Sequence, residues 1–464
     1  MSRRLALTAI ACLLLGGCAV GPDYRRPEVA LPDAYRGAAK ESAAAPALAA
    51  KNWREVFTDP PLQALIEEAL AAGPDALLAA ARIREAEALA GVSRAPLFPQ
   101  ASLSLNTSAT ARHSGDRFTS TYLGGAGISW EIDLWGRYRR ANEAAQAELL
   151  ASEDARNAMQ ASLVAKVAGY YYQLASLHDT LIVTERTAGN QREVLRLVQR
   201  LSAAGVSSAA EERQQETALA TTEAGVPTLR RQIAETENAL ALLLGRAPGA
   251  LRFDKPPQLT LPGFVPAGLP SALLEQRPDI RQAEAGLVAA NARVGEAKAQ
   301  FFPSLSLTAL FGGVSTSLAD VVNGRAPIVS SIGPNLLQPL FAGGRIWFNT
   351  EAARARVDQA AISYRKTILN ALGEVANALY AYESSAELME IQGRRVEASR
   401  EALRLAELRF RAGTANFLEV LDSQRQLLSA EVEQARALFE RRSALVSIYL
   451  ALGGGWSPAD ARSN

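Results

Sequence analysis

The chain has few of the side chains on which catalytic and metal sites depend. Its 464 residues include only two cysteines and two histidines. Cys12 lies in an N-terminal segment that we expect to be removed, and one remaining cysteine cannot form a disulfide framework or a thiolate metal site. No GxSxG, HExxH or glycine-rich phosphate-binding motif occurs. The sequence therefore predicts no catalytic residue, no metal site and no cofactor, so we do not expect an enzyme.

Net charge, aromatic content and long apolar runs are also low or absent. The formal net charge is +1, so no basic surface for nucleic acid is indicated. After residue 20 no run of about 18 apolar residues remains, and no transmembrane helix is predicted there. Aromatic residues make up 6% of the chain, whereas alanine is abundant and 48% of residues are apolar. This composition favours long helices packed through small side chains.

The N-terminus is typical of an export signal. A short cationic region, "MSRR", precedes the apolar run "LALTAIACLLLGG", which is too short to form a stable membrane span. The run ends in "LGGC", which resembles a bacterial lipoprotein signal, so we expect cleavage before Cys18 and a lipid on its thiol. Ala19, where some sorted lipoproteins have aspartate, favours the outer membrane by the same resemblance. The alternative is a signal cleaved elsewhere and an incidental cysteine.

The rest of the chain repeats one plan. "APLFPQASLSL" near residue 95 and "AQFFPSLSL" near residue 299 each end a charged, alanine-rich stretch at Phe-Pro. Pro99 and Pro303 differ by 204 in number, and Gly205 and Gly413 differ by 208. Such a steady offset indicates tandem duplication, with about four extra residues in the second hairpin.

Helix and strand patterns set the expected boundaries. Residues 100–110 alternate apolar and small polar side chains, as a strand with two different faces does. The proline-free helix from Arg137 to Ala203 would span about 100 Å. The expected segments are a signal peptide (1–17), an extended lipidated segment (18–60), a first repeat (61–245), a proline-rich connection (246–270), a second repeat (271–453) and a tail (454–464). Each repeat is expected to begin with a helical stretch, which in the first repeat starts at "PPLQALIEEAL" and runs to Phe98, before Pro99. Further along the repeats we expect β-hairpins at 100–135 and 304–341, long helices at 137–203 and 345–411, and return helices at 206–245 and 414–453.

Each repeat offers two strands, so one chain offers about four. Four strands cannot close a barrel, and an open sheet edge cannot lie in lipid. Either the strands form a sheet outside a membrane, or several chains combine their strands. Three chains would supply about twelve, which is within the range of outer-membrane barrels.

The segments "CAVGPDYRRP" and "LAELRFRAGTANFLEVLDSQRQL", with the two hairpins, resemble the TolC-like outer-membrane efflux channels, and among them the OprM/NodT-type lipoprotein branch. The likeness covers essentially the whole mature chain. It implies a mainly α fold with a small β part and two tandem repeats per chain. In a homotrimer, a shared membrane β-barrel of about 12 strands would be continued by a long α-helical coiled-coil barrel.

The resemblance also implies a function and partners. The protein would be the passive exit duct of a tripartite efflux pump for drugs or other small molecules. It would be lipid-anchored in the cell outer membrane and extend into the periplasm. There it would meet a periplasmic adaptor (membrane fusion) protein and an inner-membrane efflux transporter of RND type. Contact with outer-membrane lipid is expected, and contact with nucleic acid is not.

Family members close the periplasmic aperture with a leucine, an aspartate and an arginine after the second helix turn. The matching residues here are Leu418, Asp422 and Arg425. Leu418 and Asp422 are four residues apart and so lie on one helix face. The alternative for Asp422 and Arg425 is an exposed ion pair worth about 0.2–0.5 kcal/mol. The first repeat has Ala210 and Gln214 at these places, which restricts the predicted gate to the second repeat.

The turns "LSAAGVSS" and "FRAGTANF" resemble the tips that contact the adaptor. Alternatively they only reverse the chain, for which glycine after a helix end is expected. The predicted docking residues are Ala204, Gly205, Val206, Ala412, Gly413 and Thr414.

Four aromatic residues near the strand–helix junctions would suit a girdle at the membrane interface, although each alone is also typical of core packing. They are Trp130, Trp135, Phe341 and Trp347. His113 is expected in an external loop, and His178 lies on a heptad seam, where packing is favoured over metal binding.

Other functions stay open at this point. An outer-membrane duct for protein (type I) secretion or for metal efflux would share the same fold. A structural coiled-coil lipoprotein without a lumen would share the helices, although the alternating strands argue against it. A periplasmic enzyme has almost no support in the sequence.

Overall fold

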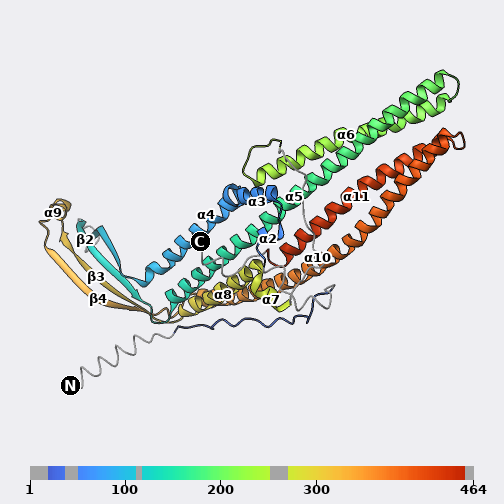
Figure 1. Ribbon diagram of the computed structural model, residues 1–464. Coiled ribbons are helices and arrows are strands. Elements are labelled where there is room, and N and C mark those ends of the chain that lie inside the picture. Colours follow the sequence, from blue (N-terminus) through green and yellow to red (C-terminus); the bar gives the residue numbers. More distant parts are fainter. Residues whose placement is uncertain (1–18, 37–50, 111–117, 251–269, 455–464) are drawn as a thin grey trace. The chain divides into compact units, whose positions relative to one another are not determined.

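The computed structural model describes residues 19–36, 51–110, 118–250 and 270–454. Within these ranges the chain is mainly helical and has one small sheet, as Figure 1 shows. This confirms the predicted mainly α class with a small β part. The predicted signal peptide, Cys18 and His113 lie outside the described residues.

The chain forms two compact units, and each unit contains parts of both repeats. The first unit is Met1–Val29, Ala81–Asp154 and Arg281–Lys366. The second unit is Ala30–Ala80, Ala155–Ile280 and Thr367–Asn464. The units therefore do not follow the two sequence repeats, because each long helix contributes residues to both units.

The sheet in the first unit is a four-stranded antiparallel meander in the order β1-β2-β3-β4. Its strands are β1 (Gln100–Thr110), β2 (Thr119–Ile132), β3 (Ser304–Ser315) and β4 (Ile328–Leu337). The two hairpins, one from each repeat, are joined where β2 pairs with β3, for example at Trp130 opposite Leu307. Among the described residues, β1 and β4 each have one neighbouring strand, so both outer edges are open.

One face of this sheet is apolar and exposed. The register pairs Leu103 with Ala126 and Phe311 with Ser330, so alternate residues of all four strands share a face. The opposite face carries mainly serine, threonine, asparagine and glycine. The exposed large side chains of the first face, which we call the apolar sheet face, are Leu103, Leu105, Ile128, Trp130, Leu307, Phe311, Ile328, Ile332 and Leu336.

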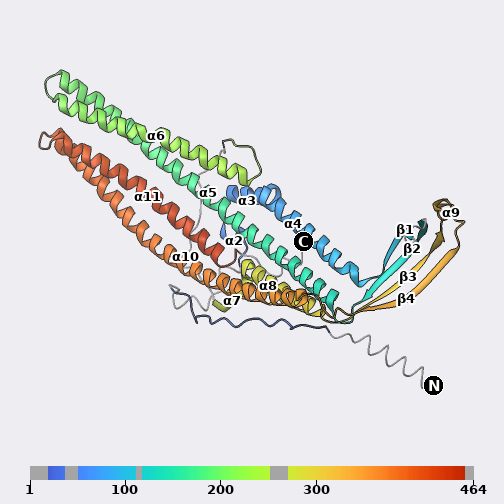
Figure 2. The ribbon, with the colours of Figure 1, turned by 180° about the vertical axis from the view of Figure 1, so that it is seen from behind.

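Four helical segments lie side by side in the first unit, in the order α4, α5, α8, α10 (Figures 1 and 2). The helices are α4 (Pro74–Arg94), α5 (Arg137–Ala203), α8 (Pro278–Ala299) and α10 (Arg345–Arg411). Ser93 of α4 donates to Asn142 of α5 across 3.2 Å. The next contacts are made by small side chains, as the alanine-rich composition predicts. They are Ala144, Ala147, Ala289 and Ala292 between α5 and α8, and Val294, Ala297 and Ala353 between α8 and α10. We call this arrangement the helix row.

The second unit contains the rest of α5 and α10 and five further helices. These are α2 (Trp53–Val56), α3 (Pro60–Ala72), α6 (Ala209–Leu243), α7 (Pro270–Gln276) and α11 (Phe417–Ala451). Its core holds large aromatic residues, and the buried Tyr171 hydroxyl donates to Asp59 across 2.8 Å. The Phe57 and Tyr449 rings meet edge to face at 5.3 Å. No described helix combines the length and the apolar composition needed to cross a bilayer.

Three local expectations differ from the structure. The first helical stretch is interrupted at Gly73, which adopts an extended conformation because Pro74 follows it and starts α4. The predicted helix to Phe98 ends at Arg94 and is followed by the short 3-10 helix η3 (Ala95–Leu97), since Pro96 lacks the N–H that an α-helix needs. The second hairpin also contains the short helix α9 (Leu318–Val322), which the sequence pattern did not reveal.

Candidate functional site

Two helix turns in the second unit carry the predicted docking residues. We call residues 204–208, between α5 and α6, the first tip, and residues 412–416, between α10 and α11, the second tip. Gly205 and Gly413 have φ angles of 75° and 72°, a conformation that favours glycine. At the second tip the Thr414 N–H closes the turn on the Arg409 carbonyl at 2.9 Å. All six predicted docking residues are exposed: Ala204, Gly205, Val206, Ala412, Gly413 and Thr414.

The predicted gate residues lie on the first turns of α11. Leu418 is 50% exposed. The Asp422 carboxylate accepts hydrogen bonds from Arg425 at 3.3 Å and from Gln426 at 2.6 Å. Both of its oxygens are thus held within α11, so the exposed ion pair considered for Asp422 and Arg425 is present in the single chain. This does not conflict with a gate, because Leu418 and the outer side of Asp422 are available to another surface.

Two of the predicted gate residues, Leu418 and Arg425, share a groove with residues of the first repeat. A groove of about 660 Å³ lies between α6 and α11. Leu418 and Arg425 line one wall, and Gln214, the counterpart of Asp422, lines the other. We call it the tip groove. Its lining is Arg213, Gln214, Thr217, Ala218, Thr221, Thr222, Leu418, Leu421, Arg425, Leu428, Ser429, Val432 and Glu433.

An apolar cluster supports the second tip from behind. Phe417, directly before Leu418, is 1% exposed, and its ring lies 5.3 Å from that of Phe410. The buried members of the cluster are Val198, Ala406, Phe417, Val420 and Leu421. Leu418 therefore extends outward from a position that the buried Phe417 and Leu421 fix.

Two of the four predicted interface aromatics are held by contacts at the strand–helix junctions. Trp130, on the apolar sheet face, donates its indole N–H to the Leu97 carbonyl at 3.1 Å. Trp135 stacks on Phe302 with ring centres 4.7 Å apart, and its indole N–H donates to the Pro303 carbonyl at 2.8 Å. The junction after β2 is thereby fastened to the junction before β3, which explains why the Phe-Pro motif occurs at this place.

The other two predicted aromatics are exposed. Phe341 is 91% exposed in the connection after β4, and Trp347 is 59% exposed in the first turn of α10. They are the counterparts in the second repeat of Asp133 and Arg139. Trp130 and Trp135 thus donate hydrogen bonds within the chain, although Trp130 is also 36% exposed, whereas Phe341 and Trp347 are more exposed.

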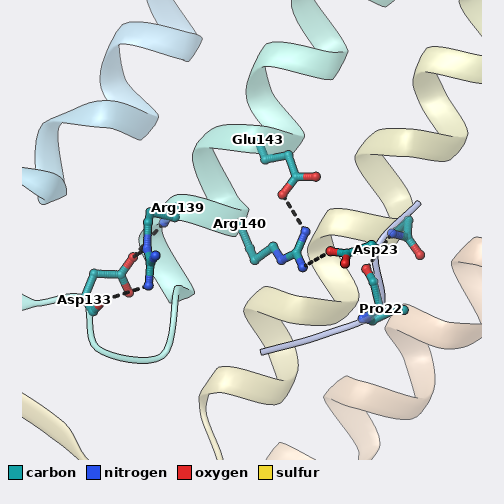
Figure 3. A network of polar contacts seen from close by, with 7 residues as sticks. Pro22, Asp23, Asp133, Arg139, Arg140 and Glu143 are labelled. Atoms are coloured by element: carbon teal, nitrogen blue, oxygen red, sulfur yellow. Dashed lines mark hydrogen bonds and ion pairs between the residues drawn. The ribbon is translucent and has the colours of Figure 1, made fainter. Parts of the chain in front are cut away.

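The N-terminal residues 19–26, which we call the N-terminal strap, lie against the helix row (Figure 3). The Arg140 guanidinium of α5 is almost buried and binds Asp23 and Glu143, each at 2.8 Å. The hydrogen bond that Arg140 donates to the Asp23 carboxylate is the largest cause that raises the pKa of Arg140. The Asn291 side chain of α8 donates to the Pro22 carbonyl at 2.9 Å. These contacts hold the first described residues of the chain on the helix row.

A second group of contacts holds the strap on α8. Arg26 binds both carboxylate oxygens of Glu284 at 2.7 Å, and the Tyr24 hydroxyl donates to the same carboxylate at 3.0 Å. Gly21 has a φ of 122° and approaches Gly295 so closely that an added Cβ would lie 2.5 Å from the Gly295 Cα. The tight fit accounts for glycine at both positions.

Sequence reasoning missed these strap partners, although a signal was present. The repeat offset of 208 places Phe348 at the position of Arg140, so the two long helices differ here in charge. A basic residue with no counterpart in the other repeat indicates a contact that only one repeat makes.

One buried ion pair joins α5 to α8. Asp154 and Arg281 lie 3.3 Å apart, and the Asp154 side chain is 7% exposed. Burial raises the pKa of Asp154 to about 6, although the nearby Arg281 opposes the shift. Groups of three or more metal-binding side chains are absent from the described part of the chain. His178 is half-buried on α5.

Comparison with known proteins identifies the family to which this architecture belongs. The family model for outer membrane efflux proteins matches residues 65–246 and 269–454, one match in each repeat. The chain belongs to the outer membrane efflux protein family. The same comparison confirms that the two repeats are related units of one family pattern.

Individual relatives agree with this assignment. This efflux protein is 35% identical to the probable efflux pump outer membrane protein TtgC of Pseudomonas putida, over 100% of the chain and 98% of TtgC. It is 32% identical to the cation efflux system protein CusC of Escherichia coli, over 98% of the chain and 100% of CusC. Among solved structures, the outer-membrane channel OprN superposes with a TM-score of 0.84 at 34% identity, covering 95% of this chain and 100% of OprN.

These likenesses confirm the TolC-like fold and the resemblance on which the expectation rested. The efflux protein is a channel component of an efflux pump and belongs to the outer membrane.

Proposed function

We propose that this efflux protein is the passive exit duct of a tripartite pump, working as a homotrimer and without enzymatic activity. Small molecules would reach it from an inner-membrane transporter of RND type through a periplasmic adaptor. The observation that carries the proposal is the four-stranded sheet with one apolar face and two open edges. Within the described residues, β1 and β4 have no second strand partner, and the large side chains of the apolar sheet face are exposed.

A trimer supplies the missing strand partners. Unpaired backbone groups at β1 and β4 would be costly in lipid, so the sheet must be continued if it enters a bilayer. Pairing β4 of one copy with β1 of the next joins three sheets into a closed barrel of about twelve strands. The apolar sheet face then faces lipid, and the opposite face, with Ser104, Asn106, Ser306 and Thr308, lines a polar lumen.

The helix row has two open ends in the same way. Small side chains join α5 to α8 within the chain, but the ends of the row, α4 and α10, expose large apolar residues. Leu89 and Val92 of α4 are 57% and 67% exposed, and Phe348 and Ile362 of α10 are 70% and 69% exposed. Packing α10 of one copy on α4 of the next would cover these side chains and continue the row into a tube.

The tip region suits the roles of periplasmic gate and of docking surface for the adaptor. Three copies of Leu418 would obstruct the lumen sterically, and three Asp422 carboxylates would add negative charge beside them. The exposed turns at Gly205 and Gly413 offer the adaptor a surface of mainly small side chains, with Val206 exposed at the first tip. We assign the gate to Leu418, Asp422 and Arg425 and the docking surface to the two tips.

The N-terminal strap supports lipid anchoring at Cys18. The strap is held beside the start of α5, where the sheet meets the helices, by the Val20 N–H bonded to the Trp135 carbonyl at 3.0 Å. A lipid on the preceding residue would then lie near the membrane surface, which agrees with the exposed Phe341 and Trp347 at the same junctions.

The cargo we favour is a drug or another small organic molecule. Among the two relatives named above, CusC is a cation efflux system protein, whereas the name of TtgC states no cargo. Metal efflux is therefore the second candidate. The partner transporter decides between small organic molecules and metal ions, because a passive duct carries the molecules that the transporter delivers.

Single-channel recording tests the duct. The purified full chain is inserted into planar bilayers, and the proposal requires steady conductance from a detergent-stable trimer. Leu418→Ala should increase the conductance, whereas Val206→Ala at the first tip should leave it unchanged. A chain that stays monomeric or never conducts would overturn the duct and favour a coiled-coil lipoprotein without a lumen.

Photo-crosslinking tests the partners. A photoreactive residue at Thr414 should capture an adaptor protein in cells, and the transporter that co-purifies with that adaptor identifies the cargo class. Capture only of other copies of the same chain would contradict docking at the second tip.

A further inference from the structure

Helix α9 lies on the apolar sheet face, at the end of β3 and β4 that is remote from α5 and α10 (Figure 1). Gly124 of β2 is paired with Leu105 and belongs to that face. A Cβ added at Gly124 would lie 2.6 Å from Cγ1 of Val321. The α9 side chain therefore occupies the place that a side chain of the strand would otherwise fill.

A second glycine makes room in the same manner. Gly313 of β3 is in register with Gly124, and a Cβ there would lie 2.9 Å from the Cβ of Ala326. Both strands thus have glycine, which lacks a side chain, at the points where residues 321–326 cross them. The connection is built to lie on the apolar face rather than over the polar lumen face.

Hydrogen bonds hold the connection in this position. The backbone N–H groups of Arg325 and Ala326 donate to the Asp320 carbonyl at 2.8 and 3.0 Å, and the Val314 N–H donates to the Pro327 carbonyl at 3.1 Å. The Asp320 carboxylate accepts from the Ser315 hydroxyl at 3.3 Å. The α9 segment is consequently a defined surface.

The outward side of α9 is apolar and continues the sheet face. Leu318 and Val322, four residues apart on one side of the helix, are 42% and 70% exposed. Ile328, paired with Gly313, is 73% exposed, and Phe311 is 62% exposed. Large apolar side chains are therefore exposed both on the strands and on α9.

The height of the apolar band explains why α9 is needed. On β3 the large apolar side chains run from Leu305 to Phe311, which spans about 20 Å along the strand and less across a tilted barrel. Outer-membrane barrels present an apolar band about 25 Å tall. Leu318 and Val322 extend the band at its outer end, where the strands themselves carry glycine.

A cation lies just beyond this extension. Arg325 follows α9 by three residues, is exposed, and has no ion-pair partner among the described side chains. At the edge of a membrane a guanidinium keeps its charge in the headgroup layer and binds phosphate through two parallel hydrogen bonds. Each such charge near an anionic surface is worth about 1 kcal/mol.

We propose that α9 and Arg325 form a binding surface for a phosphorylated lipid of the outer leaflet. Acyl chains would pack on Leu318, Val322 and Ile328, and Arg325 would bind a headgroup phosphate. The inference rests on the proposed function, because it requires the apolar sheet face to meet lipid with the helices on the periplasmic side.

Lipid retention tests the proposal. The full-length channel is placed in nanodiscs of phosphatidylcholine that contain a few per cent of bisphosphorylated lipid A, and the lipid A that stays bound after purification is measured by native mass spectrometry. Arg325→Gln should weaken lipid A binding about fivefold, the factor that corresponds to about 1 kcal/mol. Arg356→Gln, an exposed arginine of α10, is the matched control and should bind as the unmodified chain does.

Two further measurements separate the contribution of the headgroup phosphate from that of the acyl chains. Dephosphorylated lipid A should bind both Arg325→Gln and the unmodified chain equally, and Val322→Asn should weaken binding of either lipid. Equal binding of bisphosphorylated lipid A by Arg325→Gln would overturn the proposal, and so would displacement of the lipid by millimolar inorganic phosphate. Conductance is recorded on the same preparations: a conducting channel without lipid selectivity refutes only this inference, whereas a chain that never conducts refutes the proposed function.

Discussion

The two tips have the same backbone turn but are stabilised by different side chains. At the first tip Ser208 and Glu211 form a reciprocal capping box at the start of α6. At the second tip Asn416 caps α11, and the buried Phe417 packs behind it. The first tip is thus closed mainly by polar bonds near the surface, and the second by an apolar cluster.

The long helices differ between the repeats in a similar way. In α5, Arg140 and Asp154 are nearly buried and bind partners within the same chain. Their counterparts in α10 are Phe348 and Ile362, which are 70% and 69% exposed. One repeat thus has charged side chains where they are covered within the chain, and the other has apolar side chains on an uncovered surface. The two copies share one backbone plan and differ in the side chains that meet different neighbours.

The largest effect is expected from Phe417→Ala. Removing a ring that is 1% exposed leaves a cavity and should cost about 3–5 kcal/mol of local stability at the second tip. Hydrogen exchange should become much faster for amides 400–425 and less so for 200–215, where only Val198 of the preceding α5 turn belongs to the same cluster. Val206→Ala, at a side chain that is 74% exposed, serves as the control and should change neither region. Equal acceleration at both tips would contradict the view that the Phe417 ring mainly supports the second tip.

Asp154→Asn should alter the pH dependence of stability. Because the folded pKa is raised to about 6, the folded state binds this proton more tightly than the unfolded chain, and the stabilisation is lost as pH rises from about 4 to 6. The full shift corresponds to at most about 3 kcal/mol. The variant should therefore lose less stability than the unmodified chain between pH 4.5 and 7.5, measured by thermal unfolding.

The matched control for this comparison is Asp358→Asn, an exposed carboxylate of α10. It should follow the pH profile of the unmodified chain. The informative quantity is the change in stability between pH 4.5 and pH 7.5, because Asp154→Asn also removes a partner of Arg281 at every pH. Identical pH profiles for Asp154→Asn and the unmodified chain would exclude a role for this burial.

Gly205→Ala and Gly413→Ala should lower the free energy of unfolding by the same amount. Neither glycine has atoms within 4 Å of an added Cβ, so only the positive φ opposes alanine, at about 1–2 kcal/mol. Thermal unfolding of the two variants should show equal shifts. A larger loss at one tip would mean that another copy or a partner crowds that turn.

Much of the fold was accessible from the sequence because it depends on local chemistry. The predicted long helices at 137–203 and 345–411 have the bounds of α5 and α10, since glycine follows each C-terminus and no proline interrupts them. The return helices start three residues later than predicted, at Ala209 and Phe417, because Ser208 and Asn416 serve as their N-caps.

The missed features depend on contacts between distant residues. Arg140 binds Asp23, which is more than a hundred residues away in the sequence, and no sequence periodicity predicts that pair. Helix α9 consists of five residues, too few for a helical pattern, and its position depends on glycines in two strands. The four additional residues of the second hairpin were the only sign that this connection differs from the first.

The smallest effect on stability, and the sharpest test of the asymmetry between repeats, comes from Asp422→Asn. Losing an exposed ion pair with Arg425 should change stability by about 0.2–0.5 kcal/mol, near the limit of measurement. Three neutralised side chains beside the Leu418 constriction should nevertheless reduce the preference of the channel for cations, measured as the reversal potential in a salt gradient. Gln214→Ala, at the counterpart in the first repeat, should leave the reversal potential unchanged although Gln214 lines the tip groove with Leu418 and Arg425. If Asp422→Asn has no effect on the reversal potential, the carboxylate only stabilises its own helix, and the gate reduces to Leu418.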